Sequence, residues 1–183
     1  MNLFNTLGIL IDRPELLGGP EAPAGLGEAG LLGYGAGTLG LFLFLRMHGA
    51  VPPGALSFAI VLVLVLALNY FMASVIHLFM DLTGARGSAG RLFGVFGLSD
   101  YLLTALVPLA FLAKLGVVGS FMSLLLCALL VIYARVRLVR RVYPVSGNKA
   151  VLSVLLPYAG LIAAGFMASV YFSVWLVWLA MGM

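Results

Sequence analysis

Polar side chains follow a four-residue repeat within a strongly apolar part of the sequence. Asn69, His77 and Asp81 belong to this repeat, and Ala73 completes it. Residues four apart lie on one side of an α-helix, so the spacing predicts a polar stripe inside a membrane span. His77 and Asp81 could hydrogen-bond or supply two metal ligands, but two ligands make no site, and we predict no metal and no cofactor. Alternatively, His77 lies at the helix end near lipid headgroups, oriented by Asp81 or Arg86.

A glycine-rich stretch from Asp81 to Tyr101 (DLTGARGSAGRLFGVFGLSDY) is the second candidate for chemistry. Its glycines permit a tight backbone turn at the membrane surface. Arg86 and Arg91, beside exposed amides, could hold a lipid phosphate or an acidic partner. Alternatively, the stretch is a cytoplasmic turn whose arginines only set the orientation of the chain. Asp100, near its end, is a further polar candidate.

A basic run (ARVRLVRR) follows a long apolar stretch. It contains Arg135, Arg137, Arg140 and Arg141, and Lys149 follows shortly after. Cationic side chains at this position contact anionic lipid headgroups, so membrane lipid is the expected partner. Docking of another protein is the alternative.

The sequence contains no recognisable catalytic motif, and we expect no enzyme. The serines and threonines lack a histidine and an acid set beside them, and the phosphate-binding GK[ST] ending is absent. Cys127, the one cysteine, stands in an apolar run and cannot form an intramolecular disulfide. Basic residues do not alternate with exposed aromatics, which excludes a nucleic-acid site.

The elements that carry these residues must lie in lipid. Hydrophobic residues make up 63% of the 183 and charged residues 9%, against about 25% charged in soluble domains. Segments that span lipid must pair all their backbone groups within the protein, so they are helices or strands of a closed barrel. The run AIVLVLVLAL lacks the alternation of apolar and polar residues that a barrel strand shows. The predicted fold class is therefore all-α, a polytopic bundle of membrane-spanning helices.

We predict five spans, at residues 29–47, 55–80, 99–115, 117–138 and 150–181, together forming a domain over 29–183. Pro108 is a candidate kink in the third span, which is short for a full crossing. Because only Lys114–Gly119 separates the third and fourth spans, a re-entrant hairpin is the alternative there. Residues 1–28 form a separate segment, with an interfacial amphipathic helix or a frayed terminus at 2–17 and a flexible linker at 18–28.

Charge placement predicts the orientation. With five spans, eight of the ten basic residues fall on the side that holds the N-terminus, and only Arg46 and Lys114 fall on the other. Basic loops stay in the cytoplasm, so we expect a cytoplasmic N-terminus and an external C-terminus in the cell (inner) membrane.

Small residues indicate where helices approach closely. The first span carries Gly30, Gly33, Gly37 and Gly40, and the fifth carries Gly160, Ala164 and Ala168. Such stripes pack helices within one bundle or form the seam of a homo-oligomer.

Four stretches of sequence resemble the Yip family, the Rab-GTPase-interacting membrane proteins and their bacterial relatives. They are TLGILIDRPELL near the N-terminus, IHLFMDLTGARGS after the second span, GLSDYLLTALVPLA in the third, and KAVLSVLLP (Lys149 to Pro157) at the start of the last. The resemblance implies five spans with the N-terminus in the cytoplasm. The long N-terminal region and the Asp-Leu-Tyr-Gly-Pro motif of eukaryotic members are absent, so Rab binding is not carried over. The bacterial relatives have no settled activity and supply no mechanism.

Three classes of function remain. The first is a non-enzymatic membrane protein that organises lipid or recruits a partner, including a second copy of itself. The second is a small transporter or channel component for an ion, lipid or small solute that uses the polar stripe of the second span. The third is an intramembrane enzyme acting on lipid, which would require polar groups from several spans to converge, namely His77, Asp81, Arg86 and Asp100.

Overall fold

The computed structural model describes residues 25–182, and every regular element in that range is a helix. In chain order these are α2 (Leu26–Met47), α3 (Ala55–Leu82), α4 (Ala89–Asp100), η2 (Tyr101–Ala105), α5 (Leu106–Lys114), α6 (Ser120–Val142) and α7 (Gly147–Gly182). α4, η2 and α5 follow one another without a break, as one rod. The amphipathic helix predicted at residues 2–17 lies outside the described residues, as does most of the linker.

Five rods in the described part of the chain are long and apolar enough to cross a membrane. They are 22 to 36 residues long, and about 20 suffice for the hydrocarbon thickness. The chain is therefore an integral membrane protein, and the predicted all-α class with five spans is confirmed.

The third span begins ten residues before the predicted Ser99. Most of the glycine-rich stretch that was expected to be a surface turn is helix α4, whose Leu92, Val95 and Phe96 are completely buried. The prediction was wrong because glycine indicates a turn in water, whereas inside a membrane it lets helices approach. The re-entrant hairpin is not found either, since the third and fourth rods are 26 and 23 residues long.

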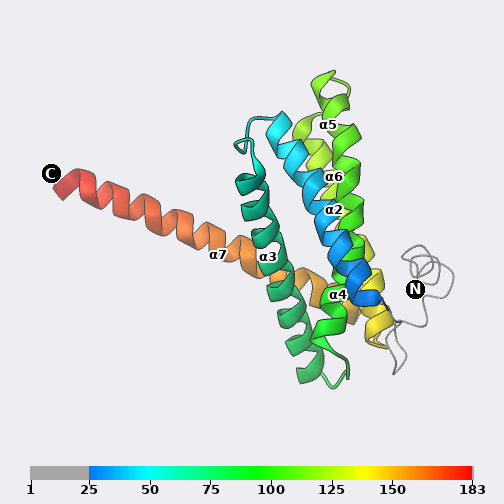
Figure 1. Cartoon of the computed structure of the whole chain (residues 1–183). Helices are drawn as coiled ribbons and strands as arrows, with labels where there is room; N and C mark the ends of the chain where they lie inside the picture. The colour runs from blue at the N-terminus through cyan, green and yellow to red at the C-terminus, as the bar shows by residue number, and fades with distance from the viewer. Residues whose placement is uncertain (1–24, 183) are drawn as a thin grey trace.

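Glycine brings α2 against the third span, backbone to backbone. Gly30, Gly33, Gly37 and Gly40 face, in turn, the backbone of Gly94, Gly97, Asp100 and Leu103. A methyl group on any of the four would overlap a carbonyl oxygen of the opposite helix. Figure 1 shows the two rods running side by side, α2 in blue to cyan and α4 to α5 in green. This interface is the tightest in the bundle and fixes the position of Asp100.

The remaining helices surround this central pair. α3 packs against α2 and α4, and α6 packs against the third span. The backbones of α3 and α6 stay apart, and side chains connect the two helices. The first turns of α7 contact both α3 and α6 and close the space between them. Four residues of these turns are buried: Ala150, Ser153, Val154 and Pro157.

Beyond Tyr158, α7 leaves the bundle. Figure 1 shows its orange and red part projecting away from the other helices. From Ala159 to Gly182 every residue is exposed except Leu179, which is half-buried. A helix that is apolar on all sides is suited to hydrocarbon, as expected of a membrane-spanning segment.

Candidate functional sites inside the bundle and at its basic end

A buried ion pair lies at the centre of the bundle. Arg135 of α6 donates through Nη2 to Oδ1 of Asp100, at the end of α4, at 2.7 Å. The two residues are only 6% and 1% exposed. Asn69 of α3 donates through Nδ2 to Asp100 Oδ2 at 3.1 Å, and its Oδ1 accepts from Arg135 Nη2. We refer to Asn69, Asp100 and Arg135 as the central cluster, because it connects three spans.

The other groups around Arg135 complete its hydrogen bonding. Nε donates to Ser99 Oγ at 3.2 Å, and Nη1 donates to the Tyr158 hydroxyl of α7 at 2.7 Å. The guanidinium carbon lies 4.7 Å from the ring centroid of Phe96, a cation–π arrangement. A buried ion pair is tolerated only when its charges are paired and its remaining donors are satisfied. Both conditions hold here, so the opposite charges of Asp100 and Arg135 balance and the cluster connects three spans.

The prediction that Arg135 contacts lipid headgroups was wrong. Arg135 belongs to the buried face of α6, which presents Ser123, Cys127, Val131 and Val139 at the same four-residue spacing. That face points at the third span, whereas the rest of the basic run lies on other faces of the helix. Cys127 and Ser123, about two and three turns earlier, were the signal in the sequence that this face packs inward.

A cavity of about 200 Å³ adjoins the central cluster. Its polar lining comes from the cluster and from Tyr158, and the rest is apolar, including Leu41, Leu68 and Val131. It lies in the space between α3 and α6 that the first turns of α7 do not reach. Such a space accepts an apolar group more readily than an ion, because the charges beside it are already paired.

His77 is paired with Tyr143 and not, as the spacing suggested, with Asp81. His77 Nδ1 and the Tyr143 hydroxyl are 2.7 Å apart and connect α3 to the turn after α6. The side chain of Tyr143 is completely buried, and its ring fills the space beside Gly87. Burial, together with the negative charge of Asp81, raises the pKa of Tyr143 to about 12.

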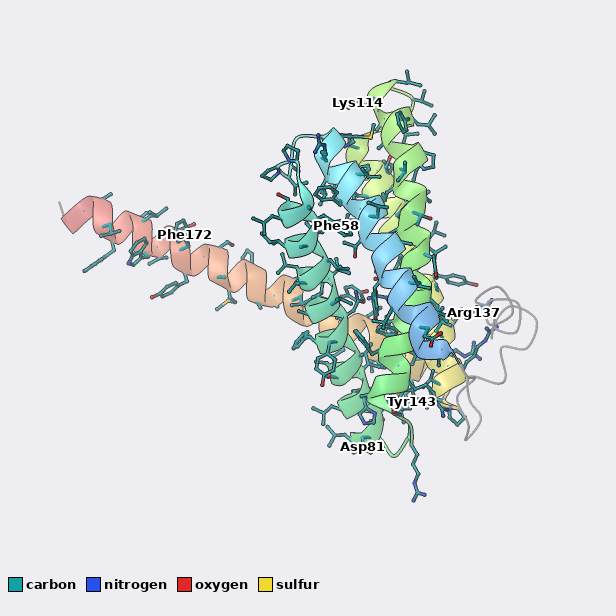
Figure 2. The ribbon with its side chains drawn as sticks, viewed as in Figure 1. Phe58, Asp81, Lys114, Arg137, Tyr143 and Phe172 are labelled. Carbon is teal, nitrogen blue, oxygen red and sulfur yellow. The ribbon has the colours of Figure 1, made fainter. Side chains whose placement is uncertain are left out.

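Among the remaining polar candidates, Asp81 and Arg86 do not join Asp100. Asp81 and Arg86 are exposed, and Arg91 is half-buried at the start of α4, where its backbone N–H donates to Ser88 Oγ. Figure 2 shows Asp81 at the same end of the bundle as Tyr143. Asp100 lies apart from them, in the central cluster. The hypothesis of an intramembrane enzyme thus loses the convergence that it required.

The end of α6 carries three exposed arginines, Arg137, Arg140 and Arg141, which we call the outer arginines. Arg137 donates through Nε and Nη2 to the Tyr133 hydroxyl at 3.0 and 2.8 Å. Lys149, expected beside headgroups, donates to the carbonyl oxygen of Thr83 at 2.9 Å and connects α7 to the end of α3. Figure 2 shows Arg137 toward this end of the bundle and Lys114 at the opposite end.

The small residues of α7 do not pack within the bundle as those of α2 do. Gly160, Ala164 and Ala168 are exposed, and nothing lies within 4 Å of a methyl group built on Gly160. The intramolecular interpretation of this stripe is therefore wrong, because α7 diverges from α3 just before it. Gly160 and Ala164 instead line an open hollow beside Phe71 of α3.

Comparison of the chain with protein-family models, with curated proteins and with solved structures finds no match in any of the three. The chain is a membrane-embedded protein of five helical spans, and the geometry of its sites is the basis for inferring its function.

Proposed function

We propose that the chain is a non-enzymatic integral membrane protein that organises membrane lipid or recruits a membrane partner. The observation that carries this proposal is the contrast between its charged groups. The ion pair of the central cluster is closed and neutral, whereas the outer arginines gather at one end with no carboxylate partner among the described residues. The groups available for an interaction are therefore cationic and lie at the membrane surface.

The same end of the bundle determines the proposed orientation. Six of the eight described basic residues outside the central cluster belong to this end, counted in spans and turns: Arg86, Arg91, Arg137, Arg140, Arg141 and Lys149. Arg46 and Lys114 belong to the other. Basic ends remain in the cytoplasm, which supports a cytoplasmic N-terminus and an external C-terminus. The resemblance to the Yip family supports the same topology.

Crosslinking and affinity purification from native membranes, followed by lipid analysis of the purified protein, tests this function. We expect anionic lipid or a membrane protein to copurify in excess of its abundance. Recovery of a monomer alone, with the lipid composition of the bulk membrane, would contradict the proposal.

A transporter is the second candidate, and the cavity beside the central cluster is the observation that favours it. Leu68→Trp, at its rim, would fill this space and leave both residues of the ion pair in the chain. A transporter would lose flux of its solute in proteoliposomes, whereas Leu64→Trp, on the lipid-exposed side of α3, would keep it. Equal flux in both variants would remove this candidate.

A further inference from the structure

A groove between α6 and α7 begins at the outer arginines. Its walls are apolar, from Leu129, Ile132 and Val136 on α6 and from Val151 and Leu155 on α7, and its volume is about 460 Å³. Arg137 and Arg140 close its basic end. They also line a polar hollow of about 280 Å³ that continues to Arg141.

The dimensions of the groove correspond to one leaflet of a bilayer. Between Leu129 and Arg140 the axis of α6 advances roughly 16 Å at 1.5 Å per residue. Half of the hydrocarbon thickness is roughly 15 Å. The length of the groove therefore matches the thickness of one leaflet.

The basic end is suited to a phosphate group. Guanidinium groups bind phosphate oxygens through paired, charge-assisted hydrogen bonds. Arg137 is held by the Tyr133 hydroxyl and lies with its guanidinium carbon 5.4 Å from the centroid of that ring, so it loses little freedom on binding. Its Nη1 group remains available, and Arg140 lies beside Gly147 at the start of α7.

We propose that this groove binds one anionic phospholipid, with its phosphate on Arg137 and Arg140 and one acyl chain along the apolar walls. Charge complementarity selects the anionic headgroup. The occupant is a lipid and not an acidic peptide, because the walls continue into the hydrocarbon, where a peptide would leave backbone groups without partners. This inference rests on the proposed function and names the lipid class and the site.

Native mass spectrometry of the full-length protein, titrated in detergent with phosphatidylglycerol or phosphatidylcholine, tests the site. We expect one tightly retained phosphatidylglycerol and no comparable phosphatidylcholine. Arg137→Gln/Arg140→Gln should weaken retention of phosphatidylglycerol at least about tenfold, since two charge-assisted contacts are lost. Arg86→Gln, which removes a charge from the same end but outside the groove, should change it little.

A second pair of variants leaves every charge in place. Leu155→Trp fills the groove and should displace the bound lipid, whereas Leu152→Trp, on an exposed face of α7 outside the groove, should not. This pair decides the question if the arginine variant fails to fold.

The outcomes separate the site from the function. The site would be overturned if the Arg86 and Arg137/Arg140 variants lost phosphatidylglycerol equally, or if Leu155→Trp retained it fully. In either case a preference of the protein for anionic lipid would still support the proposed function. Absence of any lipid preference in the wild-type protein would overturn both.

Discussion

Arg135 and Arg137 are two residues apart on one helix, yet they have opposite environments. Arg135 is 6% exposed and is bonded to Asp100, Asn69, Ser99 and Tyr158. Arg137 is exposed, is bonded to Tyr133 one turn earlier, and lies at the basic end of the groove between α6 and α7. Two residues rotate a helix by roughly 200°, so adjacent arginines of one basic run face the protein interior and the membrane.

The difference teaches that an arginine in a span acts according to the face on which it lies. Inside, its charge must be cancelled, and it then organises the surrounding helices. Outside, the charge has no carboxylate partner among the described residues, and we propose that it binds lipid at the level of the headgroups. Substitutions at the two arginines and around them test this contrast, and we expect their effects to decrease from the inner carboxylate to the outer arginines.

Removing the inner carboxylate should have the largest effect. Asp100→Ala leaves Arg135 buried without a counter-charge, and we expect a loss of about 3–5 kcal/mol in the free energy of unfolding in detergent. Arg135→Met/Asp100→Leu removes both charges and should recover most of that loss. A double variant as unstable as the single one would show that the charges are not coupled.

The glycine interface that positions Asp100 should be the next most sensitive. Gly33→Ala places a methyl group against the backbone of Gly97, and overpacking of this kind costs about 1–3 kcal/mol. Gly35→Ala, on the open side of the same helix, meets nothing within 4 Å and should be neutral or stabilising. Similar melting temperatures for the two variants would contradict the close approach of α2 and α4.

Tyr143→Phe should have an intermediate effect, because it removes one buried hydrogen bond to His77 and leaves the packing intact. We expect a loss of about 1 kcal/mol in thermal unfolding. Burial raises the pKa of Tyr143 from 10.0 to about 12, so its contribution is complete below pH 10 and is lost as pH rises toward 12. Between pH 10 and 12, the stability of the Phe variant should therefore fall less than that of the wild-type protein. Parallel curves of stability against pH for the two proteins would argue against burial of this phenol.

Substitution of an outer arginine should have the smallest effect on stability. Arg137→Gln removes an exposed charge with no carboxylate partner and should leave the unfolding transition nearly unchanged. The same measurement on Arg135→Gln should show a large loss. Comparable losses in the two variants would remove the distinction between inner and outer arginines.

The sequence was sufficient to predict that the chain lies in lipid, that it is helical and that it has five spans. Long apolar runs are compatible with little else. It also singled out Asn69 and Asp100, since polar residues within spans are rare. It did not identify Arg135 as their partner. In lipid both the buried and the exposed faces of a helix are apolar, so hydrophobic periodicity does not reveal which face packs inward.

The sequence also did not predict the direction in which α7 runs. Its small residues resemble those of α2, which pack closely, yet Gly160 and Ala164 border an open hollow. Whether such a stripe finds a partner depends on where the preceding turns direct the helix. Here Pro157 and Tyr158, at the edge of the bundle, are the last residues of α7 before its exposed part.

Lipid retention by the double variant Arg135→Met/Asp100→Leu tests the central claim most directly. If the inner pair only stabilises the scaffold, the folded variant should retain phosphatidylglycerol as the wild-type protein does in native mass spectrometry. A variant that unfolds normally but no longer retains the lipid would show that the inner charges take part in binding, and would contradict the separation of the two arginines into a structural and a lipid-binding role.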